Sequence, residues 1–424
     1  MVLFGYSIFS CKQNNSNTSN SSQIKSDGNY TSPDGKASLS VTGNLRILKL
    51  NGTNSEMGYN HGYLLGAEII DLFQRYIIWK AGVNFNDISD VQGLINWDSG
   101  SLEELQAMLD GINAALTSDQ RKITPLNQSS RDITLTDLKI INSMPDWTGA
   151  FLCSSFCIWG AGRSDGSTLL ARNLDYFVDP ESAVKKRQVV ISCNPSSGKK
   201  WVSVSVVGFI GCISGINEDG VCANLHDTNA YATTDTTGFV TRGLALRSLI
   251  QYLGSSSTPI HADAFLDPLP DYKGNEIDLC FISTSRSDDD IAGILEYDGK
   301  ADHANGRCTL RSPSLNTTLG CDMALPFTYG IINTNHYLKR KTCDGTGSSS
   351  VRYLTIKTGL INALTDSDVN VEEARAIMKS VGSTGTLHTI IMEPNVMRMH
   401  IYLSDENTIS YDSPGYHYNF SDLF

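Results

Sequence analysis

The chain has 424 residues, of which 40% are hydrophobic and 18% are charged, a composition typical of a globular protein with a sizeable core. Its 33 Lys and Arg residues against 45 Asp and Glu residues give a net charge of -12, which argues against nucleic acid and anionic membrane surfaces as partners. The 10 cysteines include no Cys-x-x-Cys pair, so the sequence predicts no sulfur-bound metal and no cofactor.

The chain begins with a short apolar stretch, Met1 to Cys11, that resembles the end of a secretion signal. Within it, Ile8-Phe9-Ser10-Cys11 resembles a bacterial lipobox, so Cys11 is a candidate site for a lipid anchor. Lys12 to Asp34 is rich in Asn and Ser, which predicts that residues 1–34 are a signal remnant and a disordered tether. These features predict an extracytoplasmic protein, either a bacterial lipoprotein or a secreted protein. The alternative is a eukaryotic secretory or lysosomal protein, which would suit the Asn-x-Ser/Thr sequons at Asn14, Asn17, Asn20, Asn29, Asn51, Asn127, Asn316 and Asn419.

Helical periodicity dominates the segment that follows the tether. Apolar residues recur at helical spacing from Asn54 to about Gly82. A second helix is expected from Ser101, with Glu104 completing a capping box, and a third short helix from Thr136. Residues 35–152 are therefore predicted to be a mostly helical segment.

The period changes to that of β-strands near residue 151. Phe151 to Trp159 and Thr168 to Leu174, joined by a turn at Arg163 to Ser167, predict a β-hairpin. Further strands are expected at 189–192, 201–207, 210–216, 221–225, 279–283, 292–297, 329–333, 387–393 and 397–403, and helices at 241–253, 350–364 and 371–381. This order predicts an α+β fold in which two antiparallel sheets lie between helical layers, an αββα sandwich. The sequence contains no run that is long and apolar enough to predict a transmembrane segment.

Cys153 stands at the start of the first hairpin strand. A thiol with a pKa near 8.5 is only slightly ionised at neutral pH, so a nucleophilic cysteine needs a base or a positive neighbour. If the chain cuts itself between Leu152 and Cys153, the new α-amine of Cys153 can take the thiol proton, and no histidine is required.

Arg172 and Asp175 lie on the return strand of the hairpin, opposite the start of the first strand. Arg172 could stabilise a thiolate, and Asp175 could hold the new α-ammonium group. Their spacing of three puts them on opposite faces of an ideal strand, so one of them is expected where the strand bends. From spacing alone, a surface Arg-Asp pair is an equally good interpretation.

Ordered motifs surround this hairpin and continue along most of the chain. Those at the hairpin are Cys153-Ser154-Ser155-Phe156, Trp159-Gly160, Asp165-Gly166 and Arg172-Asn173-Leu174-Asp175. The others are Gly58 to Leu65, Leu135 to Asn142, Gly215 to Val221, Thr334 to Leu338, Ser349 to Arg352 and Thr386 to Thr389. Together they resemble the motifs of cysteine N-terminal-nucleophile hydrolases. They are most similar to those of isopenicillin-N (acyl-coenzyme A:6-aminopenicillanic acid) acyltransferases, and more distantly to those of acid ceramidases and choloylglycine hydrolases.

The resemblance implies an N-terminal-nucleophile αββα core at 153–424 that follows an α-subunit-like segment at 35–152. It implies that Cys153 is the nucleophile and that Leu152–Cys153 is the site of autoproteolytic cleavage, although Leu152 stands where relatives often have Gly. It assigns Arg172 and Asp175 to activation of the nucleophile, Asn335 to an oxyanion hole and Arg352 to a second cation near the reacting centre. His226 or Asp227 would add a further oxyanion or pocket group.

The resulting prediction is a self-processing amide hydrolase, or an acyltransferase, that acts on a small-molecule N-acyl amide through an acyl-Cys153 intermediate. Residues 227–241 and 261–276 are expected to supply pocket walls, and Cys157 is interpreted as pocket wall because it shares strand parity with Cys153. One alternative is a papain-like cysteine protease that pairs Cys153 with His336 or His388. The other is an extracytoplasmic binding protein that kept the fold and lost the chemistry.

Overall fold

A computed structural model of the chain describes residues 24–147, 152–228, 238–266, 275–297, 308–340, 347–366 and 368–424. The lipobox at Ile8 to Cys11 and the sequons at Asn14, Asn17 and Asn20 lie outside the described residues. So do residues 229–237 and 267–274, which belong to the two predicted pocket loops.

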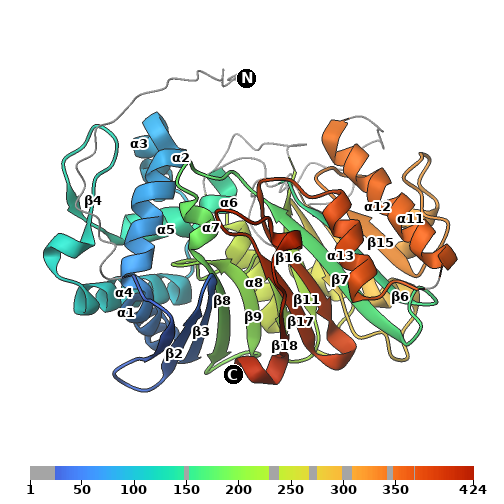
Figure 1. Ribbon diagram of the computed structural model, residues 1–424, viewed down its shortest axis with the longest axis horizontal. Coiled ribbons are helices and arrows are strands. Elements are labelled where there is room, and N and C mark those ends of the chain that lie inside the picture. The colour runs from blue at the N-terminus through green and yellow to red at the C-terminus, as the bar shows by residue number, and fades with distance from the viewer. Residues whose placement is uncertain are drawn as a thin grey trace.

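Two large sheets dominate the structure (Figure 1). The ten-stranded sheet contains, in spatial order, β1 (Gly28–Thr31), β2 (Ala37–Thr42), β3 (Leu45–Gly52), β8 (Gln188–Pro195), β9 (Trp201–Val206), β10 (Ser214–Asn217), β11 (Cys222–Asp227), β12 (Asn275–Cys280), β13 (Ala292–Tyr297) and β14 (Cys308–Arg311). The six-stranded sheet contains β15 (Gly330–Asn333), β6 (Ser154–Gly160), β7 (Gly166–Asp175), β16 (Thr386–Glu393), β17 (Arg398–Leu403) and β18 (Tyr416–Asn419). A short separate pair is formed by β4 (Lys122–Ile123) and β5 (Arg131–Asp132).

Helices cover the outer faces of both sheets. On the side of the ten-stranded sheet lie α1 (Asn54–Leu72), α2 (Ile78–Ala81), α3 (Phe85–Val91), α4 (Ser99–Ala115), α5 (Leu135–Asn142), α6 (Met144–Trp147), α8 (Arg242–Tyr252) and α9 (Pro259–Leu266). On the side of the six-stranded sheet lie α12 (Gly347–Asp366) and α13 (Val371–Ser380). Shorter helices are α7 (Ala183–Lys186), α10 (Asp288–Ile291) and α11 (Pro313–Thr317). Figure 1 shows the blue and teal helices at one end of the view and the orange helices at the other, with the strands between them.

Three apolar clusters separate these layers, and strand alternation decides which residue enters which cluster. In β6, Cys157 and Trp159 point between the two sheets, where they meet side chains such as Val204 of β9. Phe156 and Ile158 of the same strand point the other way, toward α12 and α13. Because a strand buried on both faces must be apolar on both, β6 is an almost continuous apolar run. The predicted αββα sandwich is confirmed.

The helix pair α1 and α4 packs unusually closely. A Cβ atom added to Gly58 or Gly62 would lie 2.0 Å from the backbone oxygen of Glu104 or Met108. Glycines at these positions let the two helix backbones touch, and any larger residue would push them apart. The Gly58 to Leu65 motif therefore has a packing reason in this fold.

The first part of the chain differs from its prediction. The tether was expected to reach residue 34, but Gly28–Thr31 form β1. The segment 35–152 is helical for much of its length, but it also contributes β2 and β3, and β3 pairs in parallel with β8. The helix caps also differ, because α4 is capped by Asp98 and α5 by Thr134. Every helix in the described ranges is too short or too polar to cross a membrane.

Candidate active site

Cys153 lies immediately before β6, at the edge of the contact between the two sheets. Hairpin pairing sets Ser155 opposite Arg172, which brings the Arg172 side chain to the thiol. Arg172 Nη2 donates a hydrogen bond to Cys153 Sγ over 3.1 Å, and the thiol donates to the backbone oxygen of Leu225 over 3.7 Å. The cysteine is 0% exposed. Cys153 and Arg172 are therefore in direct contact in the structure.

Arg172 is held in place by the opposite sheet. Its Nη2 donates to Leu225 O over 2.6 Å, and its Nη1 donates to Ile213 O over 3.2 Å and to the hydroxyl of Ser214. These acceptors are uncharged, so the guanidinium keeps its positive field beside the sulfur. Burial nevertheless raises the pKa of the Cys153 thiol, and Arg172 offsets only part of that rise. Burial therefore favours the neutral thiol over the thiolate.

Asp175 lies where the pairing of β7 with β16 is irregular. The register shifts between Thr386 and His388 of β16, so that Asp175 pairs with Thr386 while Leu174 pairs with His388. The extra residue lies on β16, so the bend that the spacing of three predicts for the strand carrying Arg172 and Asp175 stays a prediction. The carboxylate accepts a hydrogen bond from the hydroxyl of Thr386, and the backbone oxygen of Asp175 accepts one from the Leu152 N–H over 3.2 Å. Asp175 therefore touches the residue on the other side of the proposed cut.

Burial raises the pKa of Asp175 to about 6, although Thr386, Arg352 and Arg172 each act to lower it. Since the folded chain binds this proton more tightly than the unfolded chain, the group stabilises the fold fully below pH 3.8, and this stabilisation is lost as the pH rises through about 6. We expect the free energy of unfolding to fall by about 3 kcal/mol across that window. Denaturation from pH 4 to 7 should show the fall in a Cys153→Ala chain and not in Cys153→Ala/Asp175→Asn. Equal slopes for both chains would contradict this assignment.

Arg352 and Asn335 reach the same point from α12 and from the loop after β15. Arg352 donates to the backbone oxygen of Cys153 and to Ser154 Oγ over 2.6 Å. Its Nη2 donates to Asn335 Oδ1 over 2.8 Å, and Asn335 Nδ2 donates to the backbone oxygen of Asp227 over 2.6 Å. The five residues that the sequence assigned to the reaction, Cys153, Arg172, Asp175, Asn335 and Arg352, are therefore gathered around one peptide segment.

The two additional candidates point elsewhere. His226 is buried between the sheets, where Nε2 lies 2.8 Å from Asp278 Oδ2 and 3.1 Å from Ser155 Oγ. Both contacts use the same ring nitrogen, while Nδ1 faces the Thr334 backbone oxygen at 3.1 Å, so these residues do not form a Ser-His-Asp relay. Asp227 Oδ1 accepts a hydrogen bond from Arg242 over 2.6 Å. Of the two, Asp227 contributes to the site through its backbone oxygen.

His336 and His388, which the papain-like alternative would pair with Cys153, contact other side chains. His388 lies 3.3 Å from both Ser214 Oγ and Gln188 Oε1, and burial keeps its pKa well below the ordinary value. His336 Nδ1 lies 2.7 Å from Ser349 Oγ. Cys153 also precedes a strand, whereas a papain-like nucleophile heads a helix. Both observations disfavour that alternative.

Some contacts of the site were not predicted. Thr386 belongs to a motif that the sequence assigned only to a strand, and the bulge that turns its hydroxyl toward Asp175 left no local signal. Cys157 is not pocket wall, because it is buried between the sheets with Cys222 and Cys280. In the described ranges, His, Cys, Asp and Glu side chains do not converge in groups of three or more that could hold a metal ion.

Comparisons with known proteins give partial likenesses. No family model matches the chain. An uncharacterized protein from Archaeoglobus fulgidus is 24% identical over 232 residues, which is 51% of this chain and 38% of that protein. Protein dcd1B of Dictyostelium discoideum is 24% identical over 218 residues, which is 49% of this chain and 42% of that protein. The chain thus spans well under half the length of either relative.

Among solved structures, an N-acylethanolamine-hydrolyzing acid amidase ortholog from Caenorhabditis elegans matches with a TM-score of 0.41 and 12% identity, over 62% of this chain and 99% of that chain. A mutant conjugated bile acid hydrolase from Clostridium perfringens matches with a TM-score of 0.39 and 12% identity, over 64% of this chain and 93% of that chain. Penicillin V acylase from Agrobacterium tumefaciens matches with a TM-score of 0.37 and 14% identity, over 64% of this chain and 88% of that chain.

Proposed function

We propose that this chain is a self-processing cysteine amide hydrolase of the N-terminal-nucleophile type, similar to the isopenicillin-N acyltransferases. The observation that carries the proposal is the hydrogen bond of 3.1 Å from Arg172 Nη2 to Cys153 Sγ at the head of β6. A buried thiol beside a fixed guanidinium, at the start of a strand and next to a carboxylate, is the arrangement that an N-terminal thiol nucleophile needs.

The first reaction is the cut itself. Cys153 Sγ attacks the carbonyl carbon of Leu152, forming a carbon–sulfur bond, and the carbon–nitrogen bond breaks while the thiol proton ends on the nitrogen. Water then adds to the thioester, its oxygen going to the released Leu152 carboxyl group and one of its protons to the Cys153 sulfur. Two contacts hold the segment for this step: Leu152 N–H on the Asp175 oxygen at 3.2 Å, and Arg352 on the Cys153 oxygen.

The second reaction is turnover of an amide substrate. The new α-amine of Cys153 accepts the thiol proton, and Asp175 and Arg172 hold the ammonium group and the sulfur in register. The acyl carbon bonds to sulfur while the amine leaves with the proton, and water or a second amine then takes the acyl group. An Asn335 N–H and the Arg352 guanidinium supply hydrogen bonds to the developing oxyanion. Each donor lowers the activation free energy by about 3 kcal/mol.

The unusual residue before the nucleophile is compatible with this proposal. Leu152 is 45% exposed, so a side chain at this position occupies solvent instead of the core. The small residue that relatives often carry is therefore not required by packing here.

The cut is tested by the intact mass of the purified protein. We expect two fragments, residues 1–152 and 153–424, or a first fragment shortened at its N-terminus, and a free α-amine at Cys153 that can be sequenced directly. The processed protein is expected to hydrolyse members of a panel of N-acyl amides. A chain that stays intact and fails to label with a thiol-directed acyl probe would contradict the proposal.

We further propose an extracytoplasmic location for the protein. Cys321 is disulfide-bonded, and structural disulfides persist mainly in oxidising compartments. This observation supports the interpretation of the N-terminal residues as a secretion signal.

A further inference from the structure

Arg242 is a fully buried arginine that joins residues from both sides of the proposed cut. It is the first residue of α8 and is 0% exposed. Its Nη1 donates to Asp227 Oδ1 over 2.6 Å, and its Nε donates to Asp146 Oδ1 over 3.1 Å. Its Nη2 also donates to the backbone oxygen of Pro145. One guanidinium therefore fastens the end of β11 to the segment that precedes the cut.

We call Arg242 with Pro145, Asp146 and Asp227 the Arg242 clamp. On its Asp227 side, hydrogen bonds continue to the residues around Cys153. The backbone oxygen of Asp227 accepts the 2.6 Å hydrogen bond from Asn335 Nδ2, and Asn335 Oδ1 accepts the 2.8 Å hydrogen bond from Arg352. Arg352 in turn donates to the backbone oxygen of Cys153. The position of the Asn335 amide thus depends on where Arg242 holds Asp227.

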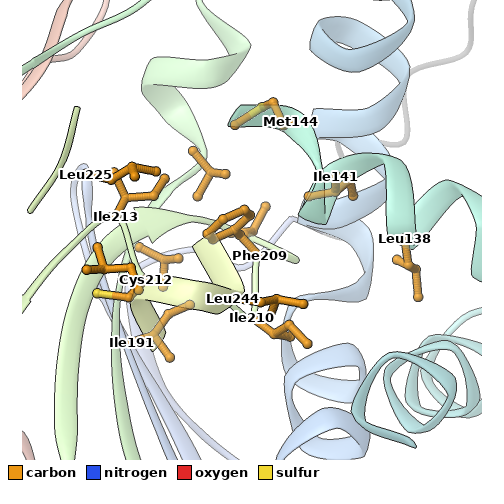
Figure 2. Close-up of a cluster of buried hydrophobic side chains, with 14 of the residues drawn as sticks. Leu138, Ile141, Met144, Ile191, Phe209, Ile210, Cys212, Ile213, Leu225 and Leu244 are labelled. Atoms are coloured by element: carbon orange, nitrogen blue, oxygen red, sulfur yellow. The ribbon is translucent and has the colours of Figure 1, made fainter. Parts of the chain in front are cut away.

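The Asp146 side of the clamp lies near the end of the described segment that precedes Leu152, which closes with Trp147. Upstream, Asn142 Nδ2 donates to Gly208 O over 2.8 Å and Asn142 Oδ1 accepts from Ile210 N over 2.7 Å. Figure 2 shows Met144 beside the same buried cluster as Leu244 of α8. The α5–α6 segment is therefore fixed to the core, and Arg242 adds polar contacts at Asp146 and Pro145.

We propose that Arg242 is a positioning residue for both reactions. Through Asp146 it holds the pre-cut segment so that the Leu152 carbonyl meets Cys153, and through Asp227 it holds Asn335 for turnover. This inference rests on the proposed function. A salt bridge that only stabilises the fold could be weakened without a selective effect on either rate, so the two roles are separable.

The chain offers a matched control on the same helix. Arg247 of α8 is also buried, and its Nη1 lies 2.7 Å from Glu104 Oε2 of α4, so this pair also joins the two sides of the cut. It differs from the Arg242 clamp in that α4 is not the segment leading into Leu152. Glu104→Gln weakens this second link without touching the residues around Cys153.

The experiment follows the full chain made by cell-free synthesis, comparing the wild type with Asp146→Asn, Arg242→Lys and Glu104→Gln. The half-time of fragment formation, the Tm, and the kcat and KM of the cut fraction on an N-acyl amide are measured. Asp146→Asn is expected to slow the cut on the order of tenfold and to leave kcat within about twofold. Arg242→Lys is expected to slow the cut by about 100-fold and to lower kcat with little change in KM. Glu104→Gln should lower the Tm and change neither rate.

The outcomes separate this inference from the function on which it rests. If the wild-type chain is cut and Arg242→Lys is cut as fast as Glu104→Gln at a similar Tm, Arg242 is merely structural and the inference is wrong. A fall in kcat for Asp146→Asn equal to that for Arg242→Lys would contradict the assignment of Asp146 to the cut and of Asp227 to turnover. A wild-type chain that is never cut overturns the proposed function and this inference with it.

Discussion

A Cys153→Ala chain is expected to remain uncut and to hydrolyse N-acyl amides roughly 10⁶-fold more slowly than the processed wild type. Both losses share one cause, because the same sulfur attacks the Leu152 carbonyl in the cut and the acyl carbon in turnover. The hydrogen bond from Arg172 has no acceptor in alanine, yet Arg172 keeps its bonds to Leu225 and Ile213, so the fold should persist. Intact mass and an amide hydrolysis assay on the same sample check both expectations.

Cys157→Ala is the matched control for this variant. Cys157 is a second buried thiol on the same strand, 2% exposed, but it lies in the apolar layer between the sheets. Its loss should lower the free energy of unfolding by about 1 kcal/mol and leave the cut and the turnover rate unchanged. If Cys153→Ala still yields fragments meeting at Leu152/Cys153, or if Cys157→Ala blocks the cut, the nucleophile has been misassigned.

Arg172→Lys is expected to slow both the cut and turnover by about 100-fold. Lysine keeps the charge, but a single ammonium cannot reproduce the planar fork that reaches Cys153, Leu225 and Ile213 at once. Each carbonyl left without its donor should lower the free energy of unfolding by about 1–3 kcal/mol. The rates and a urea denaturation curve measure the two effects separately.

Arg163→Lys controls for the general loss of a buried arginine. Arg163 lies at the far end of the same hairpin, where Nη2 donates to Glu393 over 2.8 Å and Nη1 to the backbone oxygen of Val369 over 3.1 Å. This variant should be destabilised in a similar way but should cut and turn over normally. Loss of rate in Arg163→Lys equal to that in Arg172→Lys would show that hairpin integrity, and not the guanidinium beside the thiol, governs the reaction.

The parts of the fold that sequence predicts well are those whose signal is local. The hairpin of β6 and β7 follows from two apolar runs around one turn, and α1 follows from apolar residues at helical spacing. By contrast, β3 pairs not only with β2 but also with β8, where Ile47 lies opposite Val190, far along the chain. The pairing with β8 leaves no signal in a local window, and the helical periodicity of α1 and α4 dominates the prediction for residues 35–152.

The candidate site divides in the same way. Cys153, Arg172 and Asp175 can be related by hairpin geometry alone, whereas the irregular pairing of β16 at Thr386 leaves no local signal. The sequence leaves open whether His226 or Asp227 faces the site, because alternation along β11 gives two faces and does not say which one meets the other sheet. The His226 side chain enters that contact and meets Asp278.

The Arg242 clamp shows a second limit of sequence reasoning. Its partners, Asp146 and Asp227, come from separate segments on either side of the nucleophile, and no spacing rule connects them. Only the packing of α8 against the end of α6 brings the three side chains together. Positioning contacts of this kind become visible in three dimensions alone.

The parallel pairing of β3 with β8 has a consequence for the protein after processing. Six register pairs, from Ile47 with Val190 to Gly52 with Pro195, join strands on opposite sides of residue 153 within one sheet. The processed protein would therefore be an obligate heterodimer whose subunit boundary runs through the middle of a sheet. Dissociation of the two polypeptides would be the same event as unfolding, so renaturation of the cut form should become second-order in protein concentration, whereas the uncut precursor refolds as a monomer.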